Sequence, residues 1–300
     1  MGESAAEKEL RAALSKPLSM HSSLTEFLRR VFGDKGLMAA PEDVDWKLYC
    51  LYNSPAKAAG LESDVPTLKK FINELWSKLA SAGGIRASGI QQQTNKKFAE
   101  IEQMANGLAD PASKIAFISQ CTGFLYFRVA KGNVAVRLYA NVLFDHGPDA
   151  MALLATYAGK TKDHGLVDFK IAAPAILKSR SDVIVVYCSS KEAAQAAGAE
   201  LLKQKSWLGT KCPEMTSPIT SGLGLSTGAE PERQVTGMKS DDQIPPEAQS
   251  FGTIRCELIA MAIHNFNANK GTMGSSFEVF QKFVQVAFLG YGLDPAKPGD

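Results

Sequence analysis

The sequence predicts an α+β fold with a helical N-terminal part and a central mixed or antiparallel sheet with flanking helices. Apolar residues recur at helical spacing in the first 110 residues, and again over residues 250–290. Between these stretches, runs that follow residue 123 alternate apolar and polar residues with the period of a strand. We therefore expect a helical region over residues 1–110 and an α+β domain over residues 111–300.

The helical region begins with Ser23-Leu-Thr-Glu26, which has the pattern of a capping box ahead of the helical run FLRRVF. Apolar residues from Leu68 to Leu79 then recur every three or four positions and predict a helix near residues 67–81. The glycine-containing stretch 82–90 predicts a flexible break, and a polar helix is expected near residues 92–106.

The first two strands predict a hairpin. The runs GFLYFRVA and VAVRLYANV are separated by Lys131-Gly132-Asn133, and a Gly-Asn pair between alternating runs is a hairpin signal. If Gly132 and Asn133 form the loop, Arg128 lies opposite Arg137 on one face. The reverse face is apolar and is expected to form the core.

The rest of the domain alternates helices, strands and a loop. The run VIVVYC is apolar on both faces, which is typical of a central strand. Pro, Gly, Ser and Thr are frequent over residues 209–248 and predict a long loop. Helices are expected at 148–158, at 190–204 with Ser190 as the cap, at 250–268 with Ser250 as the cap, and at 276–290 with a capping box at Ser275-x-x-Glu278; strands are expected at 166–171 and 183–188.

Composition limits the function. The formal net charge is +2, so no overall field favours nucleic acid or an anionic membrane as a partner. The five cysteines are isolated, without the spacing of zinc ligands, and they fit a reducing compartment. No apolar run approaches the roughly 20 residues of a membrane helix. We expect a cytoplasmic protein with no metal and no cofactor.

Cationic residues beside the predicted strands suggest an anion site. Two arginines placed opposite each other repel, whereas an anion between Arg128 and Arg137 would turn that cost into a clamp. Tyr139 lies on the same predicted face and adds a hydroxyl donor. The alternative is an ordinary outer face, with both arginines extended into water.

Three further cationic residues fit an anion site, but each also has an ordinary structural interpretation. Lys170 points away from the core residues of its predicted strand, yet it also fits an exposed lysine at a strand end. Arg180 precedes the central strand and is two residues from Asp182, a spacing that often gives a local salt bridge of little energy. Arg255 lies in the second turn of a helix whose N-terminus favours anions, or it reaches solvent from a simply capped helix.

The order of several short motifs resembles the HopA-type family of bacterial type III effectors. These motifs are VRLYANV, FKIAAP, SRSDVIVVY, the stretch from Met215 through the loop SGLGLSTGAEP, and SFGTIR. They span about residues 120–265, and DWKLYCLYN resembles the aromatic-rich helical segment that precedes them in the family. That family shares its domain with stand-alone lyases of class V lanthipeptide and thioamitide biosynthesis.

The resemblance implies a lyase that eliminates phosphate from phosphoserine or phosphothreonine of a precursor peptide, giving dehydroalanine or dehydrobutyrine. A partner kinase would make the phosphopeptide, and no metal is needed. Lys170 would be the base, because burial and nearby cations lower a lysine pKa. The expected phosphate ligands are Arg137, Arg180 and Arg255, with Arg128 added from the register; Tyr139 would donate to the peptide carbonyl or the leaving group, and Asp182 would orient an arginine.

Two other functions stay open. The protein is alternatively a type III effector, secreted into a host cell, that binds a host protein without catalysis. It is otherwise a domain that recognises phosphoserine or phosphothreonine and does no chemistry. His146, His164 and His264 are expected to be surface or structural residues rather than general acids.

Overall fold

The computed structural model describes residues 5–53, 65–82, 103, 124–130, 132–172, 180–230 and 251–299. Two compact units divide the chain. Unit 1 contains Met1–Pro55, Glu214–Ser217 and Glu230–Asp300, and unit 2 contains Ala56–Pro213 and Pro218–Ala229.

A six-stranded sheet forms the centre of unit 2, with the strand order β1-β3-β4-β2-β6-β5. The neighbours β1/β3, β3/β4, β4/β2 and β2/β6 are all antiparallel. The strands are β1 (Phe124–Arg128), β2 (Val136–Ala140), β3 (Leu166–Ala172), β4 (Ile184–Cys188), β5 (Ser217–Pro218) and β6 (Leu225–Ala229). The sheet confirms the α+β fold, and β4 has a neighbour on each side, as its apolar faces predict.

The predicted hairpin is wrong. Two strands, β3 and β4, lie between β1 and β2, and Arg128 faces Asp168 instead of Arg137. The chain leaves β1 through bonds from the backbone N–H groups of Val129 and Ala130 to the carbonyl of Val167, and enters β2 after Ala135 N–H has bonded to Cys188. Alternation assigns side chains to a face, but it does not identify the neighbouring strand, and the short turn sequence was the only evidence for that pairing.

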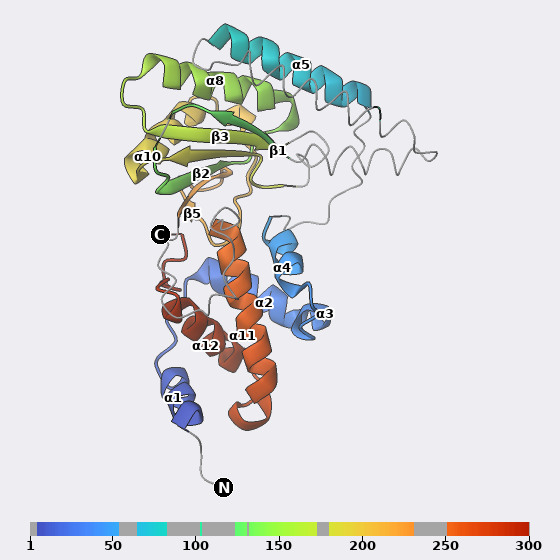
Figure 1. The fold of residues 1–300 in the computed structure, drawn as a ribbon, viewed down its shortest axis with the longest axis vertical. Coiled ribbons are helices and arrows are strands. Elements are labelled where there is room, and N and C mark those ends of the chain that lie inside the picture. The colour runs from blue at the N-terminus through green and yellow to red at the C-terminus, as the bar shows by residue number, and fades with distance from the viewer. Residues whose placement is uncertain are drawn as a thin grey trace. The chain divides into compact units, whose positions relative to one another are not determined.

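Helices cover one face of this sheet. The helices α5 (Val65–Ala82) and α8 (Gly147–Lys160) pack side by side, and α10 (Lys191–Leu202) contacts α8, β2 and β4 (Figure 1). The core between helices and sheet is a continuous apolar cluster that includes Phe71, Leu75, Trp76, Phe127, Leu138, Leu154, Phe169, Ile171, Ile184, Val186 and Leu201. The predicted helices near 67–81, 148–158 and 190–204 are thus present, and Ser190 caps α10 by accepting from Ala193 N–H.

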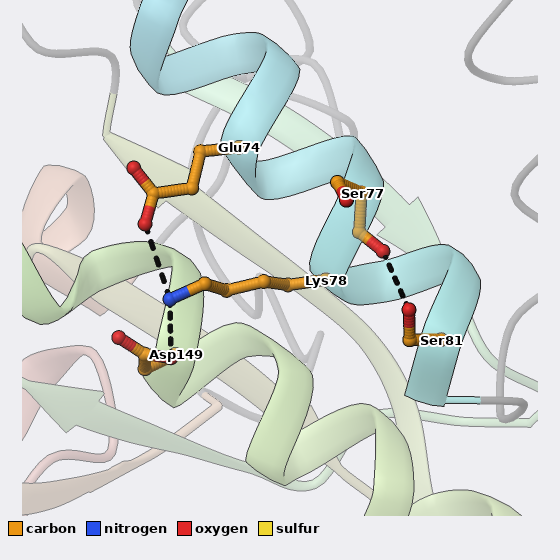
Figure 2. A network of polar contacts seen from close by, with 5 residues as sticks. All are labelled: Glu74, Ser77, Lys78, Ser81 and Asp149. Carbon is orange, nitrogen blue, oxygen red and sulfur yellow. Dashed lines mark hydrogen bonds and ion pairs between the residues drawn. The ribbon is translucent and has the colours of Figure 1, made fainter.

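One lysine ties two of these helices together (Figure 2). Lys78 on α5 donates to Asp149 on α8 at 2.5 Å and lies 3.1 Å from Glu74 one turn earlier on its own helix. All three side chains are about a third or more exposed, so the contact orients the helices and adds little free energy.

Unit 1 is helical among its described residues. The long helix α11 (Phe251–Met273) packs on α12 (Phe277–Gly290) and on α4 (Val44–Asn53). The shorter helices α1 (Ala5–Leu14), α2 (Ser22–Gly33) and α3 (Lys35–Met38) join this group, where Phe32, Phe266 and Phe280 pack ring against ring.

Both predicted capping boxes are displaced. The cap of α2 is His21, whose Nδ1 accepts from Ser23 N–H, and the cap of α12 is Ser276, which accepts from Val279 N–H. The predicted loop 209–248 also contains structure, because β6 completes the pairing of β2. The expected break at 83–90, the polar helix near 92–106 apart from Gln103, and the predicted cap Ser250 lie outside the described residues.

The expected division near residue 110 stays a prediction. The helix α5 packs on α8 in unit 2, whereas α2 and α4 pack on the C-terminal helices in unit 1. Helical spacing predicts that a segment is a helix, but it does not identify the surface that the helix covers.

Candidate functional site

The sheet face opposite the helices carries the residues that the sequence singled out. Lys170 on β3 and Tyr139 on β2 both pair with Val185 of the strand between them, so the three share one face. In the next row of the ladder, Tyr187 pairs with Asp168 and with Arg137. Three stretches of the chain, β2, β3 and β4, therefore contribute to one surface, and Arg180 and Asp182 lie in the segment that leads into β4.

Three cations gather around two aromatic rings on this face. The Lys170 ammonium lies 4.1 Å from the centre of the Phe124 ring, and the Arg180 guanidinium lies 4.8 Å from the same ring. The Arg137 guanidinium lies 4.8 Å from the centre of the Tyr187 ring, and Lys170 is 5.9 Å from that ring. We call Lys170, Arg137 and Arg180 the cation cluster.

Burial changes the protonation of Lys170. The side chain is only 9% exposed, and this loss of solvent lowers its pKa from 10.5 to about 8. The Asp182 carboxylate opposes the shift, whereas Arg137 and Arg180 add to it. With this pKa, about a tenth of the Lys170 side chains are neutral at pH 7, and the neutral form is the one that general-base chemistry requires.

Asp182 fixes the orientation of Arg180. The guanidinium donates from Nε and Nη2 to the two carboxylate oxygens of Asp182, at 2.7 and 2.8 Å. Both side chains are mostly buried, and Asp182 is 4% exposed as a residue. A two-point contact of this kind holds the guanidinium plane in one orientation.

Of the other predicted residues, Tyr139 and Arg128 lie in unit 2 and Arg255 lies in unit 1. Tyr139 is buried on the same face as Lys170. Arg128 ends the edge strand β1, with its backbone beside Asp168. Arg255 belongs to unit 1, where it is fully buried and donates to the backbone carbonyls of Pro298 and Phe251 at 2.7 and 3.2 Å.

Three residues of this face were not selected from the sequence. Phe124 and Tyr187 provide the rings, and Ser226 on β6 is the buried partner of Tyr139. Each stands at an alternate strand position, so the period-two pattern already placed Phe124 on the face of Arg128. The signal for Ser226 was hidden, because it lies in a stretch rich in Gly and Ser that resembles a loop.

The described contacts of the predicted histidines are with residues outside the cation cluster. The ring of His146 stacks on Trp207 at 5.5 Å, and His164 Nδ1 accepts from Leu166 N–H at 2.9 Å. His264 is exposed on α11. Within the described ranges, no cluster of three or more His, Cys, Asp or Glu has the arrangement of a metal site. The described helices also include none with the length and hydropathy to cross a bilayer.

The chemistry available on this face is that of an anion site with a base. Arginine forks match the oxygens of phosphate or carboxylate, and they keep their charge at all relevant pH values. The lysine beside them exchanges a proton near neutral pH because its pKa is about 8. Among the described residues, the predicted members Lys170, Arg137, Arg180, Asp182 and Tyr139 are together on this unit.

Comparisons with known proteins agree on one group. A model of the HopA1 effector protein family matches residues 125–299. The structure of the effector protein from Pseudomonas syringae pv. tomato strain DC3000 has a TM-score of 0.57 and 17% identity, over 96% of this chain and 98% of the other. The structure of the effector protein from Pseudomonas syringae pv. syringae strain 61 has a TM-score of 0.54 and 16% identity, over 93% and 95%. No curated protein matches the sequence.

Proposed function

Because the chain belongs to the HopA1 effector protein family, we propose that it is a type III effector whose cation cluster binds a phosphoserine or phosphothreonine residue of a protein and eliminates the phosphate. The fold of the two Pseudomonas syringae effectors supports the family context. The elimination itself is supported by the residues of the sheet face alone.

The reaction needs a base, a phosphate clamp and no redox partner. Neutral Lys170 Nζ removes the proton from Cα of the phosphorylated residue. The electron pair of that bond forms the Cα=Cβ double bond, and the Cβ–O bond breaks with its pair on the phosphate oxygen. That oxygen takes a proton from the Tyr139 hydroxyl or from the newly formed Lys170 ammonium, so phosphate leaves as the dianion HPO4²⁻. Arg137 and Arg180 bind the phosphate oxygens, Asp182 keeps Arg180 oriented, and Tyr139 donates to the carbonyl or the leaving group. Arg128, at the edge of the same sheet, remains a proposed additional phosphate ligand.

One observation carries the proposal: a lysine with a pKa of about 8 lies beside two arginines on one sheet face. A site that only binds phosphate gains from a charged lysine and has no need for an easily deprotonated one. Burial of Lys170 lowers its affinity for an anion at pH 8 and above, but it makes a base available.

A second candidate is an effector that binds a host protein without catalysis. The family match favours it more directly, because the family is named for effectors and carries no reaction in its name. The biosynthetic alternative, a lyase acting on a precursor peptide beside a partner kinase, uses the same chemistry with another substrate.

Mass spectrometry of a phosphothreonine peptide incubated with the protein separates these candidates. A lyase releases inorganic phosphate and leaves a peptide lighter by one H3PO4, with a dehydrobutyrine residue that adds thiols. A phosphopeptide-binding domain leaves the mass unchanged but shows a Kd in calorimetry. An effector that acts through another surface shows neither result.

The matched variant pair is Lys170→Ala and Lys160→Ala. Lys160 ends α8 and is exposed, so its loss is expected to change nothing. Lys170→Ala should lower the rate of elimination at least about a hundredfold, as expected for the loss of a general base, while the variant still binds the phosphopeptide. Full activity in Lys170→Ala would show that another group is the base.

A further inference from the structure

The cation cluster is built around aromatic rings. Phe124 is shared, because its ring centre lies 4.1 Å from the Lys170 ammonium and 4.8 Å from the Arg180 guanidinium. Tyr187 is shared in the same way by Arg137 at 4.8 Å and Lys170 at 5.9 Å. Lys170 is thus the member that contacts both rings.

The repulsion between the three cations must be offset by other contacts for the cluster to keep its arrangement. Three cations repel, and the Asp182 carboxylate already makes a two-point contact with Arg180. A ring face carries negative quadrupole density, so it attracts a cation without adding a formal charge that would compete with an incoming anion. Rings are therefore suited to hold cations apart before an anionic ligand arrives.

We propose that Phe124 and Tyr187 are positioning residues, whose ring faces hold Lys170, Arg180 and Arg137 at fixed spacing around the place of the substrate phosphate. The catalytic consequence rests on the proposed function, whereas the hold on the cations does not. The strands suit this role: Phe124 begins edge strand β1, and Tyr187 lies on central β4 next to both Arg137 and Asp168.

The first test measures the pKa of Lys170 in the free protein, without any substrate. Phenylalanine derivatives with one, two and three ring fluorines at position 124 keep the shape of the ring and progressively remove electron density from its face. The pKa of Lys170 is read from the NMR shift of its Cε as pH is raised, and Lys170→Arg identifies the signal. Asp182, Arg137 and Arg180, the charged groups that act on this lysine, stay in place throughout.

The expected result is a stepwise fall in the Lys170 pKa, by about half a pH unit to one unit over the series, because each fluorine weakens stabilisation of the ammonium. A pKa independent of the number of fluorines would overturn the role of Phe124. Phe124→Tyr, which keeps an electron-rich ring, should leave the value close to that of the native protein.

The second test concerns Tyr187 and the arginine. Tyr187→Phe keeps the ring and should retain the affinity for a phosphothreonine peptide, whereas Tyr187→Leu should weaken it about two- to fivefold. Equal affinity of the Leu and Phe variants would overturn the role of Tyr187. If the native protein binds no phosphopeptide, the proposed function fails, and the Lys170 titration still decides whether the rings hold the cluster.

Discussion

At the residue scale, Lys170 carries a cost in stability as well as a chemical opportunity. Its pKa falls from 10.5 in the unfolded chain to about 8 in the folded protein, so the unfolded state binds more protons between these values. Stability therefore rises with pH through this window. Below pH 8 the full cost of burying the ammonium is present, about 3 kcal/mol.

Replacing Lys170 by methionine should remove this cost. Lys170→Met keeps the length of the side chain without the charge, so we expect its free energy of unfolding at pH 7 to exceed that of the native protein by up to about 3 kcal/mol. Urea unfolding of both proteins at several pH values measures the difference. It should shrink as pH rises from 8 toward 10.5, and a constant difference would contradict the assigned cause.

Asp182→Asn should have the opposite effect on stability. The substitution keeps the shape but leaves the mostly buried Arg180 without its two-point anionic partner. Breaking a buried pair on one side typically costs about 3 kcal/mol or more, and about 2 kcal/mol is expected here since Arg180 is partly exposed. The same variant should lower the Lys170 pKa below 8, because Asp182 raises it. Denaturant unfolding and the NMR titration measure the two effects.

The sequence predicted the placement of single residues where that placement depends on positions close by in the chain. The pairing of Arg180 with Asp182, two residues apart, is a local contact and was predicted as one. The outward direction of Lys170 followed from alternation in its own strand. The rings of Phe124 and Tyr187 could not be selected, because their value comes from neighbours on other strands.

At the element scale, the sheet shows why strand order is harder to predict than strand position. The strands expected at 166–171 and 183–188 differ from β3 and β4 by a residue or less at each end. The predicted order was wrong because β1 and β2, which follow each other in the chain, are not neighbours in the sheet. The predicted face is retained despite this error, because Arg128 and Arg137 stand in one row of the sheet through the paired residues Asp168 and Tyr187.

Gly165 immediately precedes β3, and a substitution at this position tests the contact between the start of the strand and α10. It has a positive φ of 68°, and an added Cβ would lie 2.5 Å from the Cβ of Ala193 on α10. Gly165→Ala should therefore cost about 2 kcal/mol or more in the free energy of unfolding, from backbone strain and overpacking together.

Gly222 provides the control for that variant. Its φ is also positive, at 77°, but an added Cβ would meet no atom within 4 Å. Gly222→Ala should cost only about 1 kcal/mol, the part that comes from the backbone. Thermal unfolding of the two variants measures the contribution of the contact with α10, and equal losses would show that this contact is unimportant.

At the scale of the whole molecule, Arg255 belongs to unit 1, whereas the cation cluster belongs to unit 2. Its predicted role was phosphate binding, yet its guanidinium donates to the carbonyls of Pro298 and Phe251 within unit 1. We expect Arg255→Lys to destabilise the protein by about 2 kcal/mol, because a lysine cannot reproduce the fork of donors in a buried position. Phosphopeptide affinity of the folded fraction should stay unchanged. A weaker affinity at unchanged stability would instead assign Arg255 to the phosphate.

The helical region illustrates the same limit at this scale. The helices were predictable from their spacing, but α5 and α4 belong to different units. An amphipathic helix has one apolar face whatever it packs on, so the sequence predicts that a partner exists without naming it. Long-range packing of this kind is a property of the complete chain.

The strand order also has a consequence for how the protein acquires its shape. Strand β2 lies between β4 and β6, so one of its edges is completed only when residues 225–229 join it. Until that late segment arrives, a nascent or truncated chain exposes the open edge of β2, and such edges recruit other chains. Fragments that end before Leu225 should therefore aggregate during synthesis. Fragments that extend beyond Ala229 contain β6 and can pair it with β2.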